Sequence, residues 1–466
     1  MENNLEPTQK KRRFNDFFKI KARGSKLSTE ILGGLVTFIA MIYILPLNAS
    51  ILSDMGMDPD GVFVATAIVS GVISIFMGLY GNFPIVLSAG MGVNAYLADV
   101  IYGALGSWQA ALIVMFLAGV IYLLITLTPL RVKIINAIPN DVKRILSAGL
   151  GGFIAFVGLK NSGLITANPS TLVALGDLGQ PEVLLSLIAV IVVLGLMFIP
   201  NKKVQQFAIP IGLVATVIVG VILHYAFFPD NLALPHYDTN AKWGGQGLDK
   251  VIFGIFKNGD DWVTALSNPS TYAFIFSLIF VNMIDTTATL LAVGKGAGVV
   301  DEDGNLVDGK RAVLADAVGA AVCAPIGTST VTSFAESNVA VELGAKTGVV
   351  AVTAGTLFLL SALIFPVFTV FNSPAVLSAA LVSVGASMFA ANLKEINWED
   401  RIVAFTAFVT FLLIVLTYSI SDGLGIGLIF YCVAMLISRR GKEISVTLYV
   451  LAGLYVAYFV VKTIVG

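Results

Sequence analysis

The chain is a succession of long apolar runs separated by short polar connections. We expect fourteen membrane spans, numbered in chain order, near 28–52, 61–80, 84–103, 108–129, 143–160, 183–199, 204–226, 272–294, 311–326, 328–343, 348–370, 374–391, 402–418 and 423–438. A helix needs roughly 20 apolar residues to cross the hydrocarbon layer of a bilayer, and many of these runs reach that length. Because the runs are continuous rather than alternating, they exclude a β-barrel and predict an all-α polytopic membrane protein.

Composition supports this assignment. The 466 residues are 57% hydrophobic and only 12% charged, whereas soluble proteins carry about 25% charged residues. The net charge of −1 gives no reason to expect nucleic acid as a partner. Cys323 and Cys432 lie in separate apolar runs, and no His, Cys and acid cluster has metal-ligand spacing. We also find no nucleophile or cofactor motif, so we expect neither an enzyme nor a bound metal or cofactor.

Basic residues give the orientation of the spans. Residues 10–26 hold eight Lys or Arg before the first span, which is typical of a cytoplasmic N-terminus. The connections after spans 4, 6 and 14 are also basic, while residues 161–182 after span 5 contain no Lys or Arg. This alternation is consistent with fourteen spans in the cell membrane. A further apolar stretch at 445–465 follows, and the sequence does not decide whether it crosses the bilayer.

Seven spans on each side of the long polar connection at 227–270 give two halves of opposite orientation, an arrangement common in secondary transporters. Span 3 begins "PIVLSAGMGVNAY" at Pro84, and span 10 begins "PIGTSTVTSFAES" at Pro325. The glycines in "SAGMG" and the Thr, Val and Ser in "TSTVTS" favour helix less than extended backbone. We therefore predict a 7+7 inverted repeat in which spans 3 and 10 are broken, each with a short extended stretch leading into a half-helix.

Polar residues occur at matching depths near these breaks. Asp285 lies near the middle of span 8, and Glu336 and Asn94 follow the breaks in spans 10 and 3. An acid buried at the membrane centre costs roughly 3 kcal/mol on insertion scales, which favours a functional role over a purely structural one. A carboxyl in apolar surroundings also binds a proton more readily than one in water. The predicted supporting residues are Asn282, Thr286, Thr289 and Thr332.

Three segments together resemble a known family. "GMGVNAY" (90–96), "MIDTTATL" (283–290) and "TSTVTSFAES" (328–337) are similar to the signature segments of AzgA-like adenine/guanine/hypoxanthine permeases, in the purine branch of the nucleobase–cation symporter superfamily. "TYSISDGLGIG" (417–427) also resembles the late spans of that family. The similarity extends from about residue 17 to residue 440.

This resemblance implies a substrate site and a coupling ion. Asn94, Asp285 and Glu336 would bind the purine base, with Gly92 beside it, and a proton would be the coupling ion without any further cofactor. Either Asp285 or Glu336 would carry the proton, and the resemblance does not assign which. Oligomeric state is equally open, with a homodimer of gate domains as one option.

The resemblance also implies a division into a core that moves against a gate. The expected parts are a basic tail (1–27), core (28–130), gate (131–230), extracellular loop (231–270), core (271–370), gate (371–440) and the additional C-terminal segment (441–466). Two features depart from the family pattern: Ala288 replaces a common glycine, and "VELGAKTG" (341–348) contains Glu342 and Lys346. Two alternatives stay open, a sodium-coupled nucleobase carrier and an anion transporter of the same fold.

Overall fold

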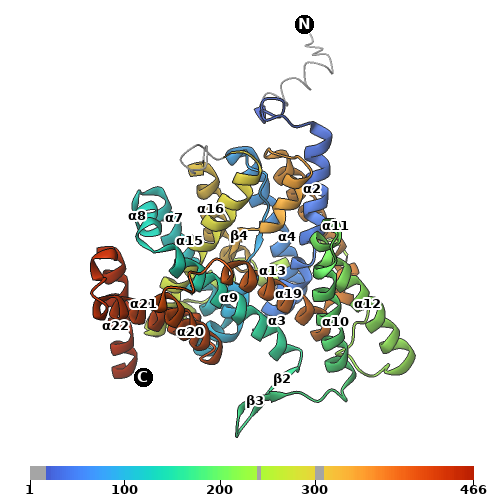
Figure 1. The fold of residues 1–466 in the computed structure, drawn as a ribbon. Helices are drawn as coiled ribbons and strands as arrows, with labels where there is room; N and C mark the ends of the chain where they lie inside the picture. Colours follow the sequence, from blue (N-terminus) through green and yellow to red (C-terminus); the bar gives the residue numbers. More distant parts are fainter. Residues whose placement is uncertain (1–16, 239–242, 300–308, 466) are drawn as a thin grey trace.

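The computed structural model describes residues 17–238, 243–299 and 309–465 and is mainly helical (Figure 1). In the first half, the spanning helices are α2 (Leu27–Met41) with α3 (Ile44–Ser53), α4 (Pro59–Phe76) with η1 (Met77–Gly81), α7 (Trp108–Leu127), α9 (Asn140–Asn161), α10 (Pro181–Phe198) and α12 (Ala208–Phe227). In the second half, they are α15 (Ser270–Gly296), α16 (Gly309–Ile326), α18 (Val349–Ser361) with η5 (Ala362–Phe371), α19 (Pro374–Leu393), α20 (Arg401–Leu416) and α21 (Ile420–Ile437).

Ten of these helices are long and apolar enough to cross a membrane. The helices α16 and α20, together with two segments that combine a strand with short helices, account for the other four expected spans. The helical segments coincide with the predicted apolar runs to within a few residues.

Spans 3 and 10 are broken as predicted. Span 3 contains strand β1 (Leu87–Ala89), then α5 (Met91–Tyr96), η2 (Leu97–Ile101) and α6 (Tyr102–Leu105). Span 10 contains strand β4 (Val331–Ser333), then η4 (Ala335–Ser337) and α17 (Asn338–Glu342). The two strands pair antiparallel, with Leu87 opposite Ser333 and Ala89 opposite Val331. Each strand therefore satisfies part of the other's backbone inside the protein, as non-helical backbone at membrane depth requires.

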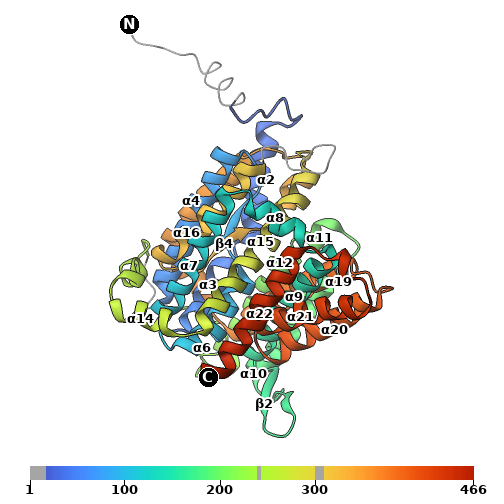
Figure 2. The ribbon, with the colours of Figure 1, turned by 90° about the vertical axis from the view of Figure 1, so that its left-hand side faces the viewer.

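The spans form two bundles. We call the first, with α2, α4, α7, α15, α16 and α18 around the β1–β4 pair, the core bundle, and the second, with α9, α10, α12, α19, α20 and α21, the gate bundle. Figure 2 shows α4, α7 and α16 on one side of the molecule and α19, α20 and α21 on the other.

Packing within the bundles follows the inverted repeat. In the core, α18 packs on α4 as α7 packs on α16, which are equivalent pairs when the two halves are superposed. In the gate, α10 packs on α19 as α20 packs on α9. Glycine permits the close crossings: a Cβ on Gly119 would lie 2.1 Å from the carbonyl oxygen of Ala320, and a Cβ on Gly348 would lie 2.1 Å from that of Gly78. The repeat is therefore visible in contacts between helices.

A proline explains the interruption of the first span. Pro46 has no N–H to donate to the carbonyl of Ile42, four residues earlier. The Leu45 N–H donates to that carbonyl instead, at 3.3 Å, and the chain changes from α2 to α3 at residues 42–43. This places Tyr43 at the junction of the two helices.

The described part of the N-terminal tail packs on the core bundle. Phe18 and Ile20 are buried against Val349, and the Glu30 carboxylate accepts hydrogen bonds from the N–H groups of Lys346 and Thr347 at 2.8 and 3.1 Å. Residues 1–16, which include most of the predicted basic tail, lie outside the described residues. Residues 17–26 thus cover the end of the core that leads into span 11.

The connections carry smaller elements. After span 5, strands β2 (Ile165–Asn168) and β3 (Leu172–Leu175) form a hairpin that projects from the body of the molecule (Figure 1). The remaining short elements are α8 (Leu130–Ala137), α11 (Lys202–Gln206), α13 (Leu248–Val251), η3 (Gly254–Phe256), α14 (Gly259–Ser267) and η6 (Gly441–Glu443).

The C-terminal stretch left open by the sequence is one continuous helix. It is α22 (Val446–Val465), which packs along α21 and ends at the side of the molecule opposite the start of α2 (Figure 2). Tyr455 on α22 also lies 3.4 Å from Ser277 of α15, hydroxyl to hydroxyl. This helix therefore contacts both bundles.

Candidate functional site

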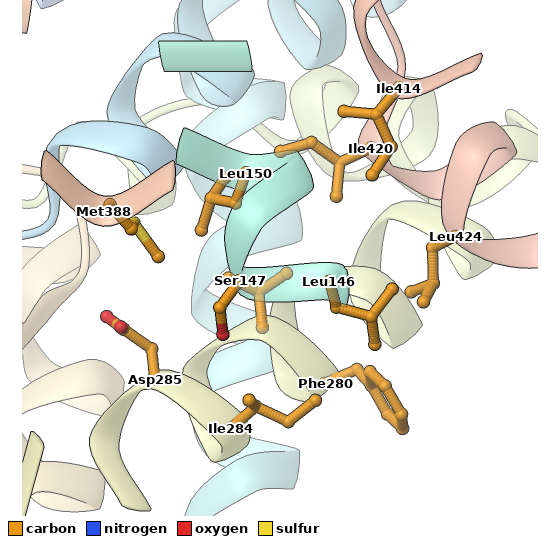
Figure 3. A pocket seen from close by; sticks show the side chains of 11 residues that line it. Leu146, Ser147, Leu150, Phe280, Ile284, Asp285, Met388, Ile414, Ile420 and Leu424 are labelled. Atoms are coloured by element: carbon orange, nitrogen blue, oxygen red, sulfur yellow. The ribbon is translucent and has the colours of Figure 1, made fainter. Parts of the chain in front are cut away.

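Asp285 lies between the two bundles. It is carried by α15 of the core and lines a cavity with an empty volume of about 330 Å³, part of it open to solvent. The residues that line the cavity are Leu146, Ser147, Leu150, Phe280, Val281, Ile284, Asp285, Met388, Ile414, Ile420 and Leu424. Figure 3 shows Asp285 on α15, facing the gate residues Ser147 and Leu150 of α9 with Met388 of α19 beside it.

This cavity is apolar apart from Ser147 and Asp285. Its walls come from α15 on the core side and from α9, α19, α20 and α21 on the gate side. Asp285 is half-buried, and no hydrogen bond reaches its carboxyl from the described part of the chain. A carboxyl in this position is available to a ligand or a proton that enters between the bundles.

Glu336 is the second half-buried acid. It lies on the short turn η4, three residues after strand β4 ends, in the broken span 10. The hydroxyl of Tyr43 donates to its Oε1 at 3.0 Å. Residues 331–333 are extended and buried, so the strand fixes where the turn that carries Glu336 begins.

Asn94 is buried within the core rather than exposed to the cavity. Its Nδ2 donates to Oδ1 of Asn48 at 2.6 Å. Asn48 in turn donates to Thr66 and Thr328, at 2.7 and 2.9 Å, and also accepts from the Ser329 hydroxyl. Among the described residues, Oδ1 of Asn94 has no hydrogen-bond partner. The amide therefore makes the expected interhelical bond and keeps one free acceptor.

Gly92 lies where the half-helix α5 approaches the gate. A Cβ at this position would come within 2.8 Å of Cδ1 of Ile154 and 3.0 Å of Cδ1 of Leu150, both on α9. Leu150 also lines the Asp285 cavity. Gly92 and Asp285 therefore face the same segment of the gate.

Two of the supporting residues predicted from sequence, Thr286 and Thr332, lie close to each other on separate spans. Thr286 donates to Oδ2 of Asp316 at 2.7 Å, not to Asp285, and its hydroxyl lies 3.4 Å from that of Thr332 on β4. Asn282 and Thr289 are buried on the same helix. Thr286 and Thr332 thus connect span 8 to the broken span 10.

Sequence reasoning did not single out Asp316 as a site residue. This buried carboxylate on α16 accepts hydrogen bonds from the Tyr122 hydroxyl, the Thr286 hydroxyl, and both the N–H and the hydroxyl of Ser333. Thr286 is adjacent to Asp285, and Ser333 lies three residues before Glu336. Asp316 therefore ties together the two segments that carry the half-buried acids.

A buried arginine lies next to this network. Arg131, on α8 after span 4, donates from Nη2 to the Thr287 hydroxyl at 3.2 Å, and its guanidinium lies 5.2 Å from the centre of the Tyr122 ring. Arg311, five residues before Asp316 in the sequence, has its guanidinium over the Tyr80 ring. Arg131 reaches the network through Thr287 and Tyr122, which only the fold brings near it.

The second departure from the family pattern, the segment 341–348, lies at the opposite end of span 10 from its strand. Glu342 accepts a hydrogen bond from Gln206 of α11, and the N–H of Lys346 donates to Glu30. Among the described residues, no cluster of three or more His, Cys, Asp or Glu side chains has the geometry to hold a metal ion. The chemistry of the site therefore rests on carboxyls, amides and hydroxyls.

Comparison with known proteins agrees with the predicted resemblance. Guanine/hypoxanthine permease PbuG of Bacillus subtilis (strain 168) is 38% identical over 456 residues, which cover 95% of this chain and 99% of PbuG. Adenine permease AdeQ of Escherichia coli (strain K12) is 33% identical over 441 residues, 94% of each chain. The similarity to purine permeases predicted from the three segments is confirmed by these relatives.

A solved structure confirms the fold class. The transmembrane domain of the cyanobacterial bicarbonate transporter BicA matches with a TM-score of 0.59, at 16% sequence identity, over 85% of this chain and 97% of that domain. At this identity the likeness concerns the fold alone. A family model described as Permease family (Xan_ur_permease) matches residues 28–426. The chain is therefore a transporter rather than an enzyme, and it belongs to this permease family.

Proposed function

We propose that this permease imports purine nucleobases by proton symport across the cell membrane, with its N-terminus in the cytoplasm. The relatives named for guanine, hypoxanthine and adenine support the substrate class. The observation that carries the proposal is the pair of half-buried carboxyls: Asp285 lines the cavity between the bundles, and Glu336 lies on the broken span 10, which packs against span 8. Keeping two acids inside the membrane costs free energy, and that cost is explained if one acid binds the ligand and the other takes up and releases a proton.

The base would be held mainly by Glu336. A purine carries ring N–H donors and ring nitrogen acceptors, and a carboxylate accepts N–H groups well. In the structure Tyr43 occupies one oxygen of Glu336, which leaves the other for the base. The half-helix α5 begins directly after β1, so its free N–H groups and Asn94 would serve the acceptors and remaining donors of the base.

The proton would be carried by Asp285. Glu336 already accepts a hydrogen bond, whereas Asp285 accepts none from the described residues and faces an apolar cavity between the bundles. A carboxyl without donors gains more from protonation than one that is already hydrogen-bonded. Two nearby acids titrate as a coupled pair, so protonation of Asp285 would also influence how Glu336 binds the base.

Transport would follow movement of the core against the gate. We assign the core to residues 28–130 and 271–370 and the gate to 131–230 and 371–440, with 231–270 as the extracellular loop. Because the Asp285 cavity has one wall on each bundle, sliding of one bundle along the other would open it first to one side of the membrane and then to the other.

Uptake by purified protein in liposomes tests this proposal. We expect labelled hypoxanthine, guanine or adenine to accumulate when the outside is acidic, and unlabelled purines to compete. A sodium gradient at equal pH should drive no accumulation. Accumulation driven only by sodium would replace the proton with sodium, and transport of bicarbonate without purine transport would overturn the substrate class.

A further inference from the structure

Tyr43 connects an acid of the core to helices of the gate. Its hydroxyl donates to Oε1 of Glu336 at 3.0 Å, across the interface between span 1 and span 10. Among the described residues it is the one side chain that hydrogen-bonds Glu336. The Tyr43 side chain is buried, with 3% of its surface exposed, so no surrounding water competes freely for this bond.

Glu336 has little other support. It lies in η4, a single three-residue turn between strand β4 and helix α17, and no side chain caps this turn. A glutamate on such a short element has several side-chain rotamers available to it. The Tyr43 hydroxyl therefore selects the rotamer in which one carboxylate oxygen is held and the other remains free.

The ring of Tyr43 faces a second, smaller cavity with an empty volume of about 180 Å³. Its other walls include Leu213 on α12 and Val376, Leu377 and Ala380 on α19, all from the gate. The helix junction produced by Pro46 places Tyr43 here, between the gate on one side and Glu336 on the other. A shift of α12 or α19 along the core would change the space available to the ring and hence the position of its hydroxyl.

We infer that Tyr43 is a positioning residue that orients Glu336 for the purine and couples this orientation to the position of the gate. The inference rests on the proposed function. When the gate packs against the ring, the hydroxyl holds Oε1 and presents Oε2 to an N–H group of the base. When the gate moves away, the ring gains room, the hydrogen bond weakens and the base is released.

Two variants test the role of the Tyr43 hydroxyl and the role of the Tyr43 ring separately. Tyr43→Phe removes only the hydroxyl, and Leu213→Ala loosens the gate wall while Tyr43 stays intact. Tyr225→Phe is the matched control, because Tyr225 is 60% exposed on α12 and makes no hydrogen bond among the described residues. Purine Kd would be measured in detergent, and KM and Vmax of uptake in liposomes, with thermal unfolding midpoints to verify folding.

For Tyr43→Phe, we expect Kd and KM to rise about tenfold, as for loss of a hydrogen bond to a charged group, with Vmax within twofold of wild type. For Leu213→Ala, which gives the Tyr43 ring room as movement of the gate would, we expect a reduced Vmax together with a rise in Kd smaller than that of Tyr43→Phe. The control variant should match wild type in all three quantities.

Several outcomes would overturn the inference. Unchanged Kd and KM in a folded Tyr43→Phe variant would exclude positioning by the hydroxyl, and an unchanged Vmax in Leu213→Ala would exclude coupling through the ring. If Tyr43→Phe does not fold, the Leu213→Ala result alone decides the coupling. A wild type that neither binds nor transports purines would overturn the proposed function, and this inference with it.

Discussion

Nζ of Lys160 lies 3.0 Å from Oδ1 of Asp99, and this ion pair joins the gate to the core. Lys160 is near the end of α9, whereas Asp99 lies in η2 of the broken span 3. Tyr418, which follows α20 of the gate, donates to the other oxygen of Asp99 at 2.9 Å, and Lys160 lies over its ring. In the proposed orientation all three residues lie on the outer side of the membrane, so these contacts would hold the two bundles together at their outer ends.

Breaking this ion pair should favour opening toward the outside. The side chains are 47% and 21% exposed, so the pair contributes about 1 kcal/mol or less. A bias of this size still changes a two-state population about fivefold. In a variant with Cys323 and Cys432 replaced by Ala, we expect Lys160→Gln to raise the rate at which an impermeant maleimide labels Ser147→Cys from outside by about that factor.

An exposed ion pair between the long connection and the core bundle provides the control for this experiment. Lys250 on α13 bonds to Asp58, which precedes α4, so this pair does not join the core to the gate. Lys250→Gln should leave the labelling rate unchanged, and exchanging the charges in Asp99→Lys with Lys160→Asp should restore it. Equal labelling in Lys160→Gln and wild type would contradict a role for the pair in holding the outer side closed.

Removing the charge of Glu336 should impair purine binding, whereas removing the charge of Asp285 should impair accumulation driven by a pH gradient. Glu336→Gln loses the carboxylate that accepts N–H groups, so we expect purine Kd to rise about 100-fold, near the upper range for bonds to a charged group. Asp285→Asn should keep Kd within a few-fold and exchange purine for purine, yet lose accumulation driven by a pH gradient. Binding, exchange and gradient-driven uptake, measured on one preparation, distinguish these outcomes.

The assignment of roles depends on that difference. A loss of binding in Asp285→Asn with retained binding in Glu336→Gln would exchange the two roles. Full pH-dependent uptake by either variant would remove that acid from the mechanism.

Asp316 should matter more for stability than for binding. Asp316→Ala would remove the acceptor of four hydrogen bonds, and each buried donor left without a partner costs about 1–3 kcal/mol. We expect a loss of at least about 3 kcal/mol, seen as a lower thermal unfolding midpoint in detergent. Asp230→Ala, at an exposed position on the outer connection, should shift the midpoint little. A midpoint equal to wild type in Asp316→Ala would show that the network is dispensable.

Local sequence patterns were sufficient to predict the spans and both breaks. An apolar run, a proline or a Thr-Val-Ser stretch affects the conformation of only the few residues around it. The segment "TSTVTS" therefore indicates extended backbone before its pairing partner is known. The same local signals identified Asp285 and Glu336, because a charge inside an apolar run is anomalous wherever the run packs.

Contacts between distant segments could not be predicted in the same way. Nothing near Glu336 in sequence points to Tyr43, and nothing near Asp316 points to Tyr122, because these pairs depend on the packing of separate spans. Asn94 is an example: its polarity within an apolar run made it a candidate site residue, but only the structure shows that its amide group donates a hydrogen bond to Asn48. The α22 helix was also undecided, since an apolar stretch of this length is compatible with several placements.

The ion pair between Asp400 and Arg440, at the end of the gate after span 14, should stabilise the protein less as the pH falls. Asp400 precedes α20, where Arg440 donates to its Oδ2 at 2.7 Å and the N–H of Ile402 to its Oδ1 at 3.0 Å. Partial burial opposes ionisation, but these hydrogen bonds prevail and lower the pKa of Asp400 below its ordinary value of 3.8. The stabilisation is therefore complete above the unfolded-state pKa, and it is lost as the pH falls through the lower folded-state pKa.

Arg440→Gln makes this dependence measurable. The variant should unfold at a slightly lower temperature than wild type between pH 7 and about pH 5, and the difference should be small because the pair is partly exposed. Below about pH 4 the difference should shrink, since Asp400 becomes protonated in both proteins. Arg439→Gln, a neighbouring exposed arginine, serves as the control with no such pH dependence. A difference between Arg440→Gln and wild type that grows on acidification would contradict the predicted sign.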